Sequence, residues 1–205
     1  MRTEPRRDPR VIRTHRLLQE ALIQLMEEQD FDQITVQDIA DRATIKRATF
    51  YLHFKDKHEL LTCIVDQIIK ELHDKVNIKW KSAPQINFTS DKPHPLFVEI
   101  FHHIAEHYHL YRAMLVTNRV AYFTTGLSAV LHEFVTYGIN HTEPDDQNLT
   151  ARREVIIKYV ESAFLEVIIW WVEQHMPYGE EEMAEQLLNL SVKGPYIQNP
   201  ITRYS

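Results

Sequence analysis

The sequence predicts an all-α protein of about nine helices, and two observations lead to this fold class. Glycine is rare, with four residues in a chain of 205, which favours helices over a turn-rich β fold. Apolar residues recur every three or four positions in one segment after another, and no segment shows the alternation of a half-buried strand. The length allows one large domain or two small ones, each with a real core.

Four helices are expected in the N-terminal part of the chain, after a flexible basic arm formed by residues 1–9. Thr35 and Asp38 have the spacing of a capping box, with Asp in place of the usual Glu. Asp56 is suited to cap the fourth helix. The spacing of apolar residues places the four helices at about 11–28, 36–43, 46–52 and from 56 to beyond 72.

The remaining helices are expected in the C-terminal part, separated by loops. Residues 79–95 contain three prolines and no sustained period, so we interpret them as a loop between two bodies of structure. Residues 140–150 form a second, polar loop. The last helix has an acidic first turn, which suits the helix dipole, and ends before Gly194. The predicted helices lie at about 96–116, 120–137, 151–175 and 180–190.

Residues 34–55, ITVQDIADRATIKRATFYLHFK, have the pattern of a helix-turn-helix, in which one helix braces a second that enters the DNA major groove. The break lies at Thr44-Ile45. Ala40 is small where the second helix must cross close to the first. Phe50 is large enough to cover the junction, and Ile45 would fill the turn.

The second helix and its flanks are rich in basic, hydroxyl and aromatic side chains that suit DNA contact. Arginine can pair with guanine in bidentate fashion, and hydroxyl, imidazole and ammonium groups suit phosphate oxygens. By periodicity alone, two short helices with a solvated charged face would explain the pattern equally well. The candidate DNA-binding residues are Thr35, Lys46, Arg47, Thr49, Tyr51, His53, Lys55 and Lys57.

The charge distribution explains how a chain of net charge −6 could bind DNA. Residues 1–57 contain 11 basic and 10 acidic residues, whereas residues 58–205 contain 12 basic and 19 acidic residues. The first 16 residues contain six arginines and two acids. The basic charge is therefore concentrated at the N-terminal end, and the acidic remainder would be repelled by phosphate.

The residue order TVQDIADRATIKRATFYLHFKDKHEL strongly resembles the N-terminal signature of the TetR family of transcriptional regulators. The resemblance implies an all-α homodimer that binds a palindromic, double-stranded DNA operator. It departs from the family at Thr44, where Gly is usual in the turn, and at Lys46, where Ser or Thr often opens the helix. The implied domains are a DNA-binding domain at 10–57, with its motif at about 34–53, and a regulatory and dimerisation domain at 58–205 that starts with a connecting helix at 58–78.

The C-terminal part resembles the DhaS-like branch of this family in the segments YRAML at 111–115, WWVEQHMPY at 170–178 and EMA at 182–184. The helix at 151–175 is apolar over most of its circumference, so we expect burial on more than one side. A two-fold partner packed on this helix and on 180–190 would provide that burial, and so would the core of a monomer.

Aromatic residues of the C-terminal part are candidates for the wall of a small-molecule effector pocket, although they would equally well fill a core. The candidates are Phe101, Tyr108, Tyr111, Phe123, Phe164 and Trp170.

Other chemistry finds little support in the sequence. His103, His107 and Glu99 share one helix face, but they flank a core stripe, and we expect neither a metal site nor a cofactor. Cys63 is the single cysteine, so no disulfide can form within the chain. No glycine-rich phosphate loop, serine nucleophile elbow or Cys–His arrangement is present, which argues against an enzyme.

The sequence therefore predicts a cytoplasmic, homodimeric repressor whose operator binding is modulated by a small molecule. The most apolar stretch, 155–172, is interrupted by charged residues, which argues against a membrane span. The alternative is a protein of the same fold that acts as a protein-interaction subunit or coactivator without control by a small ligand.

Overall fold

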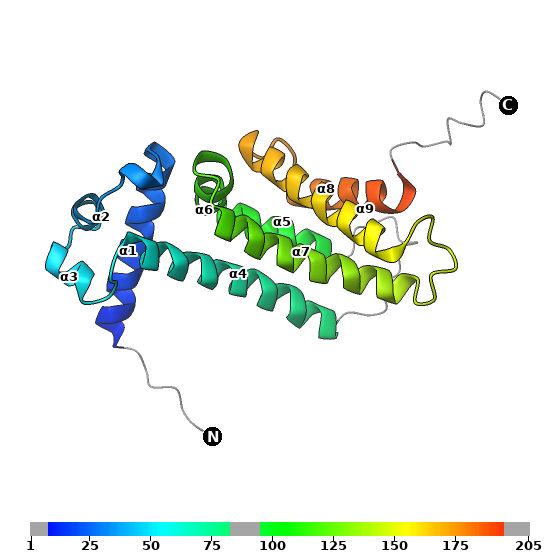
Figure 1. The fold of residues 1–205 in the computed structure, drawn as a ribbon, viewed down its shortest axis with the longest axis horizontal. Helices are drawn as coiled ribbons and strands as arrows, with labels where there is room; N and C mark the ends of the chain where they lie inside the picture. Colours follow the sequence, from blue (N-terminus) through cyan, green and yellow to red (C-terminus); the bar gives the residue numbers. More distant parts are fainter. Residues whose placement is uncertain (1–7, 83–94, 195–205) are drawn as a thin grey trace, which may run out of the picture. The chain divides into compact units, whose positions relative to one another are not determined.

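The computed structural model describes residues 8–82 and 95–194, and within these ranges the fold is all-α, as the sequence predicted. Nine α-helices, a 3₁₀ turn and a π-helix are found there, and no strand (Figure 1). The elements are α1 (Pro9–Glu28), η1 (Phe31–Gln33), α2 (Val36–Arg42), α3 (Arg47–Tyr51), α4 (Lys57–Ser82), α5 (Pro95–Glu106), α6 (Tyr108–Arg112), η2 (Ala113–Thr117), α7 (Ala121–Thr142), α8 (Arg153–Glu173) and α9 (Glu180–Lys193).

The chain divides into two compact units, and the first unit includes a segment that is distant in sequence. It consists of Met1–Ile68 together with His109–Thr124, and the second consists of Ile69–Tyr108 together with Thr125–Ser205. A domain boundary between residues 57 and 58 therefore stays a prediction. The segment His109–Thr124 is part of the N-terminal unit because its side chains pack on α1 and on the elements near it.

Capping side chains set the starts of α1, α2 and α4. The side chain of Asp8 accepts a hydrogen bond from the backbone N–H of Arg10, and Pro9 opens α1. Pro9 is thus helical and does not belong to the predicted arm, whose residues 1–7 lie outside the described ranges. The capping box of Thr35 and Asp38 is confirmed, with both reciprocal hydrogen bonds present. Asp56 accepts from the backbone N–H of Glu59, as expected of a cap for α4.

The single helix predicted at 96–116 is wrong, because the structure interrupts it at His107. The backbone nitrogen of His107 lies 3.2 Å from the carbonyl oxygens of both His103 and Ile104. Its N–H is therefore shared between the bond expected in an α-helix, to the residue four positions back, and a tighter bond to the residue three positions back. After α6 the chain widens into a π-helix that ends at Thr117, and the backbone N–H of the next residue, Asn118, bonds to the carbonyl of Ala113. Each turn of a π-helix contains about one residue more than a turn of an α-helix, so the buried face shifts only gradually along the segment. The spacing of apolar residues therefore continues through the π-helix, as it does through the break at His107.

The boundaries of the other C-terminal helices also differ from prediction. Residues 79–82 belong to α4, and most of the predicted loop, at 83–94, lies outside the described residues. α7 continues to Thr142, and Arg153 closes the shortened loop by donating to Asn140, Asp146 and the carbonyl of Glu143. At the end of α9, Gly194 has φ +73°, a conformation that glycine adopts without strain.

The second unit is built around aromatic contacts between α5, α7 and α8. The ring of Phe97 packs against those of Phe134 and Phe164, at centroid distances of 4.7 and 5.9 Å. Phe101 meets Trp171 edge to face at 5.2 Å. Gly126 permits a close approach of α7 to α4, since a Cβ there would lie 3.0 Å from Cγ1 of Ile69.

Among the residues of the second unit that the structure describes, Glu161 carries a buried carboxylate, and its neighbours keep it charged. Glu161 of α8 accepts hydrogen bonds from Ser128, Lys158 and His132 at 2.5, 2.9 and 3.1 Å. Burial would raise the pKa of Glu161, but these three hydrogen bonds together hold it below its usual value. In the described ranges, no helix combines the length and the apolar character needed to cross a membrane.

Candidate nucleic-acid interface and ligand cavity

The turn between α2 and α3 is held by buried residues, as the helix-turn-helix pattern predicted. Ala40 and Phe50 are fully buried, and Ile45 is half-buried. The backbone N–H of Ile45 bonds to the carbonyl of Ala40 at 2.9 Å, which closes the turn. The backbone bond therefore holds the turn against α2, and α3 packs against α2 with its Phe50 side chain buried.

Thr44 adopts a left-handed backbone conformation in this turn, with φ +57°. The family's usual glycine would take this conformation without strain, whereas a β-branched residue would not. The turn therefore keeps the geometry that glycine would give it, and the strain is carried by Thr44.

The outer face of α3 presents exposed side chains that suit DNA. Arg47 and Tyr51 are exposed on α3, and Thr49 is half-buried. Lys46, the N-cap of α3, and Lys55, in the turn after α3, are exposed beside them. Arg47 lies along Tyr51, with Nη2 3.2 Å from the phenol oxygen and the guanidinium 5.6 Å from the ring centroid. This contact orders the guanidinium at the surface of the helix.

Leu52 was missed by the sequence reasoning, although it is 81% exposed at the end of α3. An apolar side chain in this position is suited to contact a thymine methyl group. The signal was available in the sequence, because Leu52 lies between Tyr51 and His53, two residues that were selected.

Besides Arg47 and Tyr51, three more of the predicted DNA-binding side chains have partners within the protein. Lys57 donates to the carbonyls of Phe31, Asp32 and Ile34 at 2.8 to 3.0 Å, which uses all three ammonium hydrogens. Its ammonium group is thus committed to the loop before α2 and has no donor left for phosphate. Thr35 is engaged in the capping box. The ring of His53 is half-buried, 5.0 Å from the ring of His15 on α1.

Asn118, also missed, ties the same loop to the segment that follows α6. Its side-chain oxygen accepts from the backbone N–H of Phe31 at 2.7 Å, and its amide donates to the carbonyls of Met26 and Ala113 at 2.7 and 3.1 Å. A second tie comes from Glu27 of α1, which contacts His109 at 2.9 Å. The loop that precedes the helix-turn-helix is therefore held by His109–Thr124, a segment from the C-terminal half of the chain.

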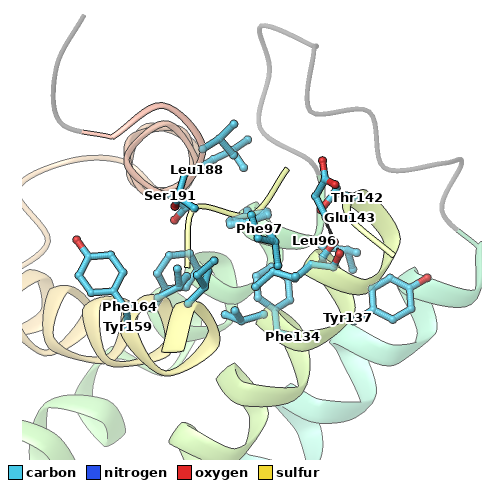
Figure 2. A pocket seen from close by; sticks show the side chains of 18 of the residues that line it. Leu96, Phe97, Phe134, Tyr137, Thr142, Glu143, Tyr159, Phe164, Leu188 and Ser191 are labelled. Atoms are coloured by element: carbon cyan, nitrogen blue, oxygen red, sulfur yellow. Dashed lines mark hydrogen bonds between the residues drawn. The ribbon is translucent and has the colours of Figure 1, made fainter. Parts of the chain in front are cut away.

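A cavity of about 540 Å³ lies within the second unit, between α5, α7, α8 and α9. Figure 2 shows Phe97, Phe134 and Phe164 directed towards one another, with Leu188 and Ser191 of α9 across from them. The volume falls within the range of about 300–1,000 Å³ that is usual for small-molecule sites. The lining is mostly apolar, and Glu143 is the charged residue among the lining residues that the structure describes.

Of the six aromatic residues predicted to line an effector pocket, Phe164 lines this cavity and the other five lie elsewhere. Tyr111 and Phe123 pack on each other in the first unit, with centroids 5.2 Å apart. The other three belong to the second unit: Phe101 packs on Trp171, the hydroxyl of Tyr108 lies 2.7 Å from a ring nitrogen of His175, and Trp170 is 42% exposed. Sequence spacing identified aromatic residues but not the helices whose side chains meet.

Comparison with known proteins gives matches to both parts of the chain. Residues 18–63 match the family model of bacterial regulatory proteins of the tetR family, and residues 91–193 match that of a transcriptional regulator C-terminal region. The HTH-type transcriptional regulator YxbF of Bacillus subtilis is 40% identical over 72 residues, which are 35% of this chain and 19% of YxbF.

The HTH-type dhaKLM operon transcriptional activator DhaS of Lactococcus lactis is 38% identical over 59 residues, 29% of this chain and 32% of DhaS. The matches thus span about a fifth and a third of the lengths of these curated relatives. The structure of FadR from Bacillus subtilis in complex with stearoyl-CoA aligns with a TM-score of 0.67 at 17% identity, covering 89% of this chain and 100% of FadR. At that identity the likeness concerns the fold.

Proposed function

Because this chain belongs to the TetR family of transcriptional regulators, we propose that it is a homodimeric repressor that binds a palindromic DNA operator through α3. We further propose that a small molecule in the cavity of the second unit modulates this binding. The observation that carries the proposal is the exposed set of Arg47 and Tyr51 on α3 and of Lys46 and Lys55 beside it, with the buried Phe50 fixing the inner side of the helix.

Base reading is assigned to Arg47, and positioning to its neighbours. A guanidinium that is already ordered against Tyr51 loses less conformational freedom when it pairs with guanine. Lys46 and Lys55 supply phosphate contacts, and Leu52 supplies an apolar contact to a thymine methyl. Lys57 is assigned a different task, since its three hydrogen bonds hold the loop before α2.

Dimerisation is assigned to the outer face of α8 together with α9, in support of the sequence-based expectation. Val155, Tyr159 and Trp170 of α8 are 54%, 73% and 42% exposed, and Leu190 and Val192 of α9 are 49% and 55% exposed. Large apolar side chains gathered on the outer surface are typical of an interaction site. A second copy of the chain would cover them and would present two α3 helices to successive major grooves.

The proposed effector is an elongated, apolar molecule without an anionic head group. FadR from Bacillus subtilis was solved with stearoyl-CoA, so a protein of this fold can hold a long acyl chain. The cavity of the present chain has apolar and aromatic walls that suit such a chain. Its described lining contains Glu143 and no Lys or Arg, so a phosphate or carboxylate would meet a negative charge there.

The DNA-binding assignment is tested by fluorescence anisotropy with the DNA upstream of the protein's own reading frame. We expect Arg47→Ala to lower the affinity by about 1–3 kcal/mol, the range for a bidentate base contact. Tyr51→Ala should also weaken binding, because it removes the side chain that orders Arg47. Arg152→Ala, which removes an exposed arginine before α8, is the matched control and should bind like the wild type.

Undiminished binding by both Arg47→Ala and Tyr51→Ala would contradict the assignment of α3 as the recognition helix. If the folded wild-type chain binds neither this DNA nor a pool of random duplexes, the result favours the alternative function, a protein-interaction subunit or coactivator, over a DNA-binding repressor. Addition of an apolar effector should release the DNA from the wild type. Phe97→Trp, which fills the cavity, should weaken that response while leaving DNA affinity intact.

A further inference from the structure

Two imidazoles and one carboxylate come together in the second unit, and none of the three residues lines the cavity. Glu71 lies on α4, His103 on α5, and His107 directly after α5. Nε2 of His107 lies 3.3 Å from Oε1 of Glu71, and Nε2 of His103 lies 3.9 Å from the same oxygen. One potential ligand atom from each of the three residues lies within 4.8 Å of the other two.

The local backbone explains why the two rings face the same way. His103 and His107 are four residues apart, the spacing that puts two side chains on one helix face. Although α5 ends at Glu106, the N–H of His107 still bonds to the carbonyl of His103, so His107 keeps its place one turn further on. Their ring centroids are 4.7 Å apart. The carboxylate comes from α4 and not from Glu99, the residue that the sequence grouped with them.

The ligand types and spacing match those of a zinc site with one open position. In a tetrahedral site with metal–ligand distances of about 2.1 Å, neighbouring ligand atoms lie about 3.4 Å apart. Two of the three separations, 3.3 and 3.9 Å, bracket that value, and the third, between the two imidazoles, is at most 4.8 Å, so side-chain rotations would bring the three atoms to it. The His103 side chain is fully buried, whereas those of His107 and Glu71 are 32% and 39% exposed, which leaves a route from solvent.

The positive charge of Lys75 disfavours a cation bound between Glu71, His103 and His107. Its ammonium lies 3.6 Å from Oε1 of Glu71 and 2.6 Å from Oε2 of Glu106. When an ion binds the Glu71 oxygen, Lys75 keeps its shorter contact with Glu106. The ammonium group of Lys75 therefore still has a carboxylate beside it. Its positive charge still repels the ion and therefore limits the affinity.

We propose that Glu71, His103 and His107 form a binding site for one divalent transition-metal ion, of which Zn²⁺ fits best, and that the ion links α4 to α5. This proposal replaces the expectation from the sequence that the chain holds no metal. Because the ion would bind the folded arrangement of three residues from two helices, it stabilises the folded chain.

The experiment is a calorimetric titration of the full chain, freed of metal by chelation, with Zn²⁺ alone, and a parallel titration with Co²⁺ followed by visible absorption. We expect one ion per chain and a thermal unfolding midpoint that rises with Zn²⁺. His107→Gln and Glu71→Gln should each lower the affinity at least tenfold. Lys75→Gln should raise the affinity, a gain that loss of structure cannot produce.

The control is His132→Gln, which removes another histidine beside a carboxylate, Glu161, and should leave the affinity unchanged. Circular dichroism of each variant confirms the helical fold. The proposal is overturned if Zn²⁺ binding is the same in His107→Gln and Glu71→Gln as in the wild type. It is equally overturned if neither the wild type nor Lys75→Gln binds Zn²⁺.

Discussion

At the scale of single residues, Thr44 replaces the glycine that is usual in the family, yet its backbone keeps the left-handed conformation that suits glycine. We expect Thr44→Gly to raise the free energy of unfolding by about 1 kcal/mol. The left-handed conformation disfavours a residue with a Cβ by about 1–2 kcal/mol, and the greater freedom of glycine in the unfolded chain offsets part of that gain. The measurement is chemical denaturation followed by circular dichroism.

Ala43 provides the matched control for Thr44, since it is the preceding residue and has a right-handed conformation with φ −73°. Ala43→Gly should lower the free energy of unfolding by about 1 kcal/mol, because glycine there brings flexibility without relief of strain. A loss of stability in Thr44→Gly as large as that in Ala43→Gly would show that Thr44 is not strained in this turn.

At the scale of the element, α3 lacks a side-chain cap, because its N-cap residue is Lys46. We expect Lys46→Ser to raise the free energy of unfolding by about 1 kcal/mol, since a serine oxygen can accept from the free backbone N–H groups of the first turn. The same change removes a phosphate contact. DNA affinity should therefore fall, and the slope of log affinity against log salt should decrease by about 1.

Lys46→Ala separates the two effects, since it removes the charge without supplying a cap. It should weaken DNA binding as much as Lys46→Ser does and leave the stability of α3 nearly unchanged. Equal stability of the two variants would argue against an uncapped N-terminus, and an unchanged salt slope in both would argue against a phosphate contact by Lys46.

At the scale of the whole molecule, we propose that a second copy of the chain covers the exposed apolar face of α8. We expect the double variant Val155→Glu, Trp170→Glu to sediment as a monomer, because two carboxylates on each chain would be buried without partners at the interface. Operator affinity should fall at least tenfold, since a monomer contacts a single half-site. Analytical ultracentrifugation and anisotropy measure the two quantities.

Glu154→Lys serves as the control for the dimer, because it changes the charge of an exposed residue next to Val155. It should remain a dimer. A double variant that keeps the sedimentation coefficient of the wild type would move the interface away from this face of α8.

The parts of the fold that the sequence predicted well are those that depend on neighbouring residues. The capping box of Thr35 and Asp38 involves residues three apart, and the start of α4 depends on Asp56 and the residues just after it. The boundaries that failed lie where the helix changes its period or where distant groups intervene. The break at His107 leaves no trace in the apolar spacing, and the loop after α7 is closed by Arg153, a residue beyond it.

The candidate sites follow the same division. Arg47 and Tyr51 were predicted to point away from the core, and they are exposed, because the side of α3 that Phe50 buries determines which side remains outside. Lys57 was selected for its charge, but three carbonyls before α2 already hold it. Of the aromatic residues selected for a ligand pocket, Phe164 alone lines the cavity. The walls of the cavity come from four helices, and the spacing of residues within one helix does not show which side chains of different helices meet.

The sequence by itself determined the all-α class and the position of the helix-turn-helix, because caps and apolar periods act over a few residues. Only the tertiary structure decided which side chains from distant segments meet. Asn118 holds the loop at Phe31, and Glu71 of α4 brings a carboxylate to His103 and His107, the two residues that sequence spacing had grouped with Glu99. Local patterns carry no information about such encounters, because the packing of whole helices determines them.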